Sequence, residues 1–146
     1  MELKDVIDQF AEDFGVGGVR PDENGAYAFD IDSLRVVFSK TEGGRSMMTL
    51  SAIADLPAAG RERLFQILLE SSGTDSTMFS LEPGGNRLFL QRVDGLDNLD
   101  LARFEANLDS FLATAHRWRR LLAEYEAVLS ASDGKGKSGG IWDINV

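Results

Sequence analysis

Residues 77–129 read TMFSLEPGGNRLFLQRVDGLDNLDLARFEANLDSFLATAHRWRRLLAEYEAVL and carry the most regular pattern in the chain. Its first part alternates apolar and polar residues on both sides of a Pro-Gly-Gly-Asn turn at residues 83–86, which predicts a β-hairpin with one apolar face. From residue 101 onward, apolar residues recur at spacings of three and four, which indicates one apolar stripe along an α-helix. Asp97, three residues before Asp100, fits a capping box that starts this helix. A helix of roughly 30 residues is about 45 Å long, so other elements must cover the rest of its stripe.

The chain before this stretch predicts a helix, three strands and a second helix. Residues 2–14 place their apolar side chains on one helical face, and glycines follow that end the helix. Three runs of alternating residues come next, at 26–31, 34–38 and 47–53, and the short turns between them predict an antiparallel meander. Residues 61–71 are predicted to be helical. The order helix, three strands, helix, two strands, helix predicts an α+β fold in which helices pack on an antiparallel sheet.

We expect a single domain over residues 1–130 and a tail rich in Gly, Ser and Lys over residues 131–146. The last six residues of this tail, Ile141-Trp142-Asp143-Ile144-Asn145-Val146, are apolar and strand-like. Our hypothesis is that they dock on an apolar groove or a sheet edge, either of the same molecule or of a neighbouring one.

Composition excludes several classes of function. The 146 residues contain no cysteine, which rules out disulfides, thiolate metal sites and cysteine nucleophiles. The formal charge of −9 repels polyanions, so we expect neither nucleic acid nor anionic lipid as a partner. The first residues are acidic and amphipathic, and no apolar run is long enough to cross a bilayer. These features predict a cytoplasmic protein that does not insert into membranes.

No catalytic, metal-binding or cofactor-binding constellation emerges from the motifs. The single histidine, His116, has the position of a helix-surface residue. Asp30 and Asp32 are spaced like the start of a calcium loop, but Leu34 stands where the next ligand is needed. Residues 135–140 contain Gly-Lys-Ser, but they follow a helix and lack the glycine that a phosphate-binding loop requires five residues earlier. We therefore expect no enzymatic activity and no cofactor.

Residues 64–122, LFQILLESSGTDSTMFSLEPGGNRLFLQRVDGLDNLDLARFEANLDSFLATAHRWRRLL, resemble the Tir chaperone (CesT-like) family of type III secretion chaperones. The order of elements is similar over nearly the whole chain apart from the tail. The resemblance implies a small, acidic, cytoplasmic homodimer without enzymatic activity. Such a protein binds an extended segment of a secreted effector protein and keeps it soluble and export-competent, without ATP.

The resemblance also implies two sets of contact residues. The second helix has apolar residues on more than one side, which favours burial against another chain. The implied dimer interface comprises Leu64, Phe65, Leu68, Leu69, Phe79 and Leu81. The implied client-binding residues are Phe10, Phe14, Tyr27, Phe29 and Val37. Ordinary core packing is the alternative for every residue in both sets, and it is the stronger alternative for Tyr27 and Phe29.

Two other functions remain open at this level. The first is a regulatory interaction module of the same fold that sequesters a regulator or another chaperone. The second is a small enzyme with an unrecognised site, which would require a deep polar pocket holding titratable groups with shifted pKa values.

Overall fold

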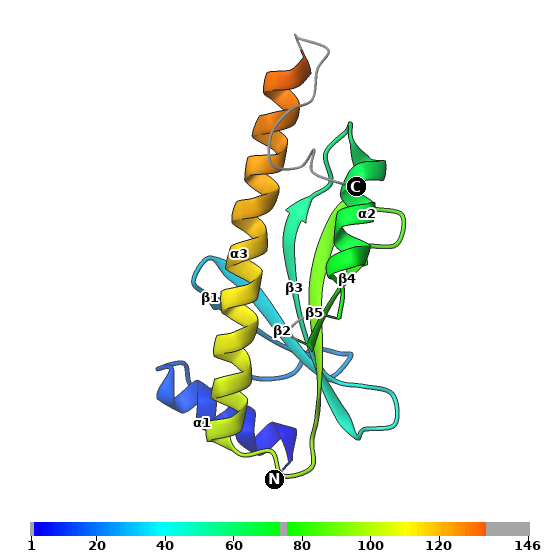
Figure 1. Ribbon diagram of the computed structural model, residues 1–146. Helices are drawn as coiled ribbons and strands as arrows, with labels where there is room; N and C mark the ends of the chain where they lie inside the picture. Colours follow the sequence, from blue (N-terminus) through cyan, green and yellow to red (C-terminus); the bar gives the residue numbers. More distant parts are fainter. Residues whose placement is uncertain (1, 74–75, 134–146) are drawn as a thin grey trace.

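The computed structural model describes residues 2–73 and 76–133, and its three helices and five strands follow the predicted order (Figure 1). The α+β prediction is confirmed. The elements are α1 (Leu3–Asp13), β1 (Tyr27–Ile31), β2 (Leu34–Lys40), β3 (Ser46–Asp55), α2 (Arg61–Ser71), β4 (Thr77–Leu81), β5 (Arg87–Gly95) and α3 (Leu101–Asp133).

The five strands form one antiparallel sheet in the order β1-β2-β3-β5-β4. Strands β1 to β3 make the predicted meander, and β4 and β5 make the predicted hairpin. Strand β5 joins the two parts because it pairs with β3 along almost the whole length of both strands. The edges of the sheet are therefore β1 and β4.

One face of the sheet is the core face, on which α1 and α3 pack. Its side chains follow the alternation of the strands and include these buried residues: Tyr27, Phe29, Ile31, Leu34, Val36, Phe38, Met47, Thr49, Ser51, Ile53, Leu88 and Leu90. Phe10 of α1 meets Phe104 of α3 at 5.2 Å between ring centroids, and Phe38 of β2 meets the same ring at 5.0 Å. These aromatic contacts hold α1, the meander and the start of α3 together.

The start of α3 differs from the expectation in one detail. Asp100, rather than Asp97, caps the helix: its Oδ1 accepts a hydrogen bond of 2.8 Å from the backbone nitrogen of Arg103. Asp97 lies in the preceding loop, because the helix begins only at Leu101. An N-cap side chain reaches the backbone two or three residues further on, which fits Asp100 and not Asp97.

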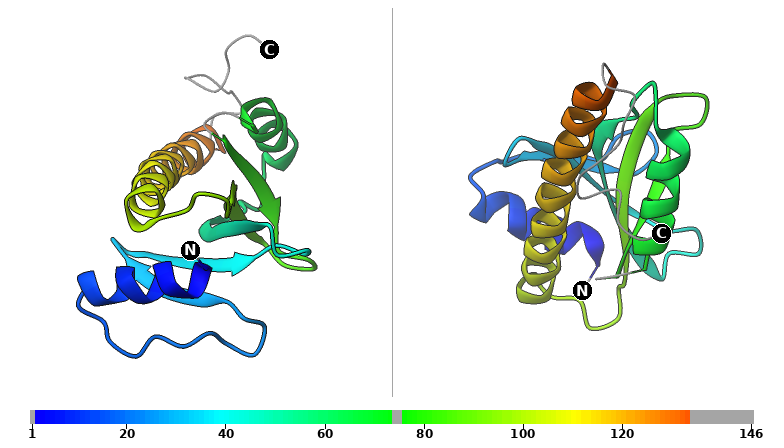
Figure 2. Two further views of the ribbon diagram at one scale, coloured as in Figure 1. Left: turned by 90° about the horizontal axis from the view of Figure 1, so that it is seen from below. Right: turned by 45° about the horizontal axis from the view of Figure 1, so that its top comes forward.

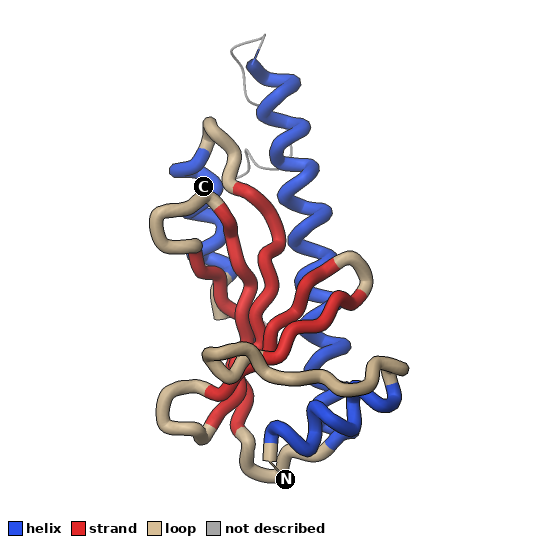
Figure 3. Tube along the Cα trace, turned by 180° about the vertical axis from the view of Figure 1, so that it is seen from behind, coloured by secondary structure: helices blue, strands red, loops and turns tan. Residues whose placement is uncertain are grey.

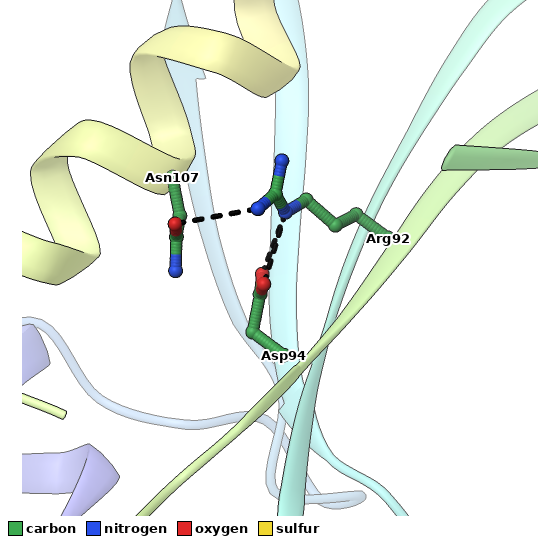
Figure 4. Close-up of polar contacts among 3 residues, drawn as sticks. All are labelled: Arg92, Asp94 and Asn107. Atoms are coloured by element: carbon green, nitrogen blue, oxygen red, sulfur yellow. Dashed lines mark hydrogen bonds and ion pairs between the residues drawn. The ribbon is translucent and has the colours of Figure 1, made fainter. Parts of the chain in front are cut away.

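A polar cluster fastens β5 to α3 (Figure 4). The Nε of Arg92 lies 2.9 Å from Oδ2 of Asp94, and its Nη2 donates to Oδ1 of Asn107 on α3 at 3.3 Å. Both charged side chains are only 14% exposed, so each depends on the other for its hydrogen bonds.

Candidate binding surfaces

The first candidate surface is a groove between α2 and β4, which lie side by side (Figure 1). Its volume is about 380 Å³, and no charged side chain lines it. We call it the α2–β4 groove, and its lining residues are Phe65, Leu68, Leu69, Ser72, Phe79, Ser80, Leu81 and Leu88. Five of the six residues implied as a dimer interface therefore lie together here. The sixth, Leu64, is 1% exposed and belongs to the core.

The rim of the α2–β4 groove exposes large apolar side chains to solvent. Leu69 is 75% exposed and Leu81 is 45% exposed, although both are leucines. The floor is firm, because the ring of Phe79 packs edge-on against the buried Trp118 of α3 at 5.0 Å. Exposed apolar side chains around a preformed hollow are typical of a protein–protein contact.

The orientation of α2 is set where the helix begins. The hydroxyl of Tyr125 on α3 donates a hydrogen bond of 2.6 Å to the carbonyl oxygen of Gly60, and Arg61 Nε donates one of 2.6 Å to the carbonyl oxygen of Pro57. Gly60 has φ of +71°, and a Cβ at this position would lie 2.8 Å from the Tyr125 hydroxyl. Burial raises the pKa of Tyr125, which keeps the hydroxyl in its protonated, donating form.

The second candidate surface lies at the edge strand β1, beside the end of α1. Phe14 is 45% exposed and stacks on Phe10 at 5.4 Å. The other three residues implied as client-binding on this side, Phe10, Tyr27 and Phe29, are buried. Phe14 is therefore the only one of these four whose side chain is exposed, and the rings of Phe10 and Phe29 contact it from inside.

Val16 is a second exposed apolar residue just after α1, and it was missed in the sequence. It is 42% exposed and follows Phe14 closely. Because it stands between glycines in a loop, no helical or strand periodicity marks it. The outer backbone edge of β1 has no strand partner among the described residues, since β1 pairs with β2 alone.

Val37 lies on the opposite face of the sheet, away from Phe14. It pairs with Ala28 and Leu50, which also point away from the core, so these three belong to the outer face. Seen from behind, the strands lie in front of α2, and the β1–β2 hairpin crosses in front of α3 (Figure 3). The outer face carries further apolar side chains that the implied set did not include: Met48, Leu50, Met78, Phe89 and Val93.

Paired charges border the outer face near the β4–β5 turn. Arg87 forms an ion pair with Glu82, and its guanidinium also lies 5.4 Å from the centre of the Phe89 ring. The hydrogen bond between the two side chains lowers the pKa of Glu82 and raises the pKa of Arg87. Both groups therefore stay charged over the ordinary pH range.

Metal and membrane sites were also sought in residues 2–73 and 76–133. Within these ranges no group of three or more His, Cys, Asp or Glu side chains is placed to hold a metal ion. No helix in the same part of the chain combines the length and the apolar character needed to span a bilayer.

Comparison with known proteins gives a family and a fold. A model of the Tir chaperone protein (CesT) family matches residues 5–119. Comparison with curated proteins gave no match. Among solved structures, the chain is similar to one in the ExsC–ExsE complex, with a TM-score of 0.70 and 20% identity over 84% of this chain and 97% of that one.

Two further structures have the same fold. The chain resembles one in the HopA1–SchA chaperone–effector complex, with a TM-score of 0.66 and 13% identity over 80% of this chain and 92% of that one. It also resembles one in the heterodimeric ExoU–SpcU complex from the type III secretion system of Pseudomonas aeruginosa, with a TM-score of 0.58 and 16% identity over 79% and 96% of the two chains. At these identities the likeness concerns the fold alone.

Proposed function

This chain belongs to the Tir chaperone protein (CesT) family, and from that premise we propose that it is a type III secretion chaperone-like protein. It binds an extended segment of a secreted effector protein and keeps that segment soluble and export-competent. Binding uses no ATP, no cofactor and no catalytic residue. The protein acts in the cytoplasm as a homodimer.

The observation that carries the client-binding role is the edge of β1, which has no strand partner among the described residues, together with the exposed ring of Phe14, 6.5 Å from the ring of Phe29 in that strand. A client segment in extended form adds a strand at this edge through backbone hydrogen bonds. Alternate side chains of the client then contact the exposed ring of Phe14. The buried residues Phe10 and Phe29 hold that ring in place, so their contribution to binding is indirect.

The α2–β4 groove supports the homodimer. Two copies related by a two-fold axis present the same surface to each other, so a protruding side chain and a hollow on that surface must fit. Leu69 protrudes at the rim of a hollow of about 380 Å³, which provides both parts. In the proposed dimer, Leu69 of each copy enters the groove of the other. The outer face, with Val37, remains open to a client in this arrangement.

Purification of the chain from its native host, followed by mass spectrometry of the proteins bound to it, tests the proposal. We expect a secreted effector in stoichiometric amount, with the bound segment protected from proteolysis while it remains extended. A non-secreted regulator or another chaperone as the partner would replace this proposal with the regulatory function. A chain that is monomeric by light scattering at micromolar concentration and brings down no client would contradict it.

A further inference from the structure

The final residues of β3 leave one side of the strand without a partner. Strand β2 pairs with β3 only from Met47 to Ser51, and in the described part of the chain Ala52, Ala54 and Asp55 pair with β5 alone. The strands separate where the Ser51 hydroxyl donates a 2.9 Å hydrogen bond to the carbonyl oxygen of Arg35. A bulge at Ile53 follows. Bulges often end pairing between strands, so a free backbone edge here is a feature of the fold.

A hollow of about 280 Å³ lies beside this free edge. Figure 2 shows the end of β3 between α3 and α2, the elements that supply the walls. The lining residues are Ile53, Ala54, Asp55, Pro57, Leu64, Arg119, Leu122, Ala123, Tyr125 and Glu126. A cavity of about 150 Å³ holds a benzene molecule, so this hollow has room for an indole ring. We call the free edge and the hollow together the β3 end site.

We propose that residues 141–146 of the same chain occupy the β3 end site as a short added strand. These residues lie outside the described part of the structure, and the proposal rests on their sequence and on the site. The segment alternates, so that Trp142, Ile144 and Val146 share one face. An added strand that directs this face toward α3 places the Trp142 side chain in the hollow.

The length of the connecting chain fits this occupant. Helix α3 lines the hollow up to Glu126 and continues to Asp133, a further distance of about 10 Å. Residues 134–140 follow, and a Gly/Ser-rich linker of this length has a root-mean-square span of about 14 Å. The segment can therefore fold back to the site without strain. A short tether of this kind gives an effective concentration in the millimolar range, so even weak docking is populated.

Charge also favours this site over the α2–β4 groove. The linker carries Lys135 and Lys137, and the β3 end site is lined by two carboxylates, Asp55 and Glu126, and one cation, Arg119, so its lining is acidic by one charge. The α2–β4 groove has no charged lining residue and belongs to the proposed dimer contact. Docking at the β3 end site also covers backbone groups that could otherwise pair with another chain. This inference is independent of the client-binding function.

Hydrogen exchange followed by mass spectrometry tests the proposal on the full chain. Residues 142–146 should exchange about tenfold or more slowly than they do in a free peptide of residues 134–146. Ala123→Glu places a charged side chain in the hollow from an exposed position and should abolish this protection. The matched control is Ala113→Glu, an exposed alanine of the same helix that does not line the site, and it should leave the protection intact.

Three outcomes would overturn the proposal. The first is exchange of residues 142–146 as fast as in the free peptide, and the second is protection that survives Ala123→Glu. The third is protection that depends on another site or another chain. Protection that falls on tenfold dilution would place the segment on a neighbouring chain, and protection that is lost with Leu69→Arg would place it in the α2–β4 groove. Deletion of residues 141–146 should speed exchange at residues 52–57 without lowering the mass measured by light scattering.

Discussion

The side chain of Tyr125 near the end of α3 is hydrogen-bonded to the backbone of Gly60 at the start of α2, with 2.6 Å between the two oxygen atoms. This contact connects residues from distant parts of the sequence and fixes the angle of the helix that forms one wall of the α2–β4 groove. The stability of the domain and the shape of its proposed dimer surface therefore depend on the same pair.

Gly60→Ala should destabilise the protein by about 2–4 kcal/mol in urea unfolding. A left-handed backbone costs a non-glycine residue about 1–2 kcal/mol, and the added Cβ also meets the Tyr125 hydroxyl at 2.8 Å. Gly18→Ala is the matched control, because Gly18 has φ of +69° with nothing within 4 Å of its Cβ position. The control should lose only the stability that comes from the left-handed backbone conformation. Equal losses of unfolding free energy in both variants would contradict this account.

Tyr125→Phe should cost about 1 kcal/mol at neutral pH, the usual contribution of one hydrogen bond. Burial raises the pKa of Tyr125 above that of the unfolded chain, which is about 10. The tyrosine's contribution is thus complete below pH 10 and is lost as pH rises above it, because the unfolded chain ionises first. Urea unfolding at pH 8 and at pH 10.5 measures this effect. Between these two pH values the unfolding free energy should fall less in the variant than in the wild type.

Leu69→Arg should convert the proposed homodimer into a monomer. The substitution removes an apolar contact worth about 2–3 kcal/mol and places a charge in the interface. The dissociation constant of the dimer should therefore rise about a hundredfold or more. Light scattering over a dilution series measures this change. Val93→Arg is the control, since Val93 is 42% exposed on the outer face and does not line the groove. Dissociation by both variants alike would place the interface elsewhere.

Phe14→Asp should weaken client binding about tenfold to a hundredfold while the dimer persists. The exposed ring is replaced by a carboxylate next to the β1 edge, and little of the core is lost because Phe14 is 45% exposed. Asp13→Asn, at the neighbouring exposed position, is the control. Titration calorimetry with the co-purified client segment measures both affinities. If only Val37→Asp weakened binding, the outer face would be the client site instead.

Asp94→Ala should destabilise the fold by about 2–4 kcal/mol, because it leaves the guanidinium of Arg92 without its carboxylate in a site where it is only 14% exposed. Replacing both residues, as in Arg92→Met with Asp94→Ala, should cost less than the sum of the single changes. Additive losses in urea unfolding would show that the two side chains act independently. Asn107→Ala, which removes the weaker contact at 3.3 Å, should cost about 1 kcal/mol.

Periodicity predicted the elements well because it depends only on neighbouring residues. The bounds of α2, residues 61–71, and the opposite directions of Val36 and Val37 both follow from local pattern. Strand order is not a local property, and neither the place of β5 between β3 and β4 nor the separation of β2 from β3 after Ser51 could be read from the chain.

The candidate sites were less predictable for a related reason. An apolar alternation shows which side chains share a face, but it does not show how much of that face other elements cover. Phe10 and Phe14 thus had equal claims in the sequence, whereas the structure leaves Phe14 45% exposed and Phe10 only 7%. Val16 could not be identified as an exposed apolar residue from the sequence, because a single apolar residue in a glycine-containing loop belongs to no helical or strand periodicity.

The pairing of β5 with β3 also sets when the protein can fold during its synthesis. The meander is complete by Asp55, but its partner strand starts at Arg87 and the covering helix α3 ends only at Asp133. While the intervening residues are being translated, β3 lacks its partner strand β5, and helix α3 does not yet cover the core-facing phenylalanines. The ribosome-bound chain therefore cannot complete its sheet until nearly all of it has emerged, because β3 and β5 join residues that lie far apart in the sequence.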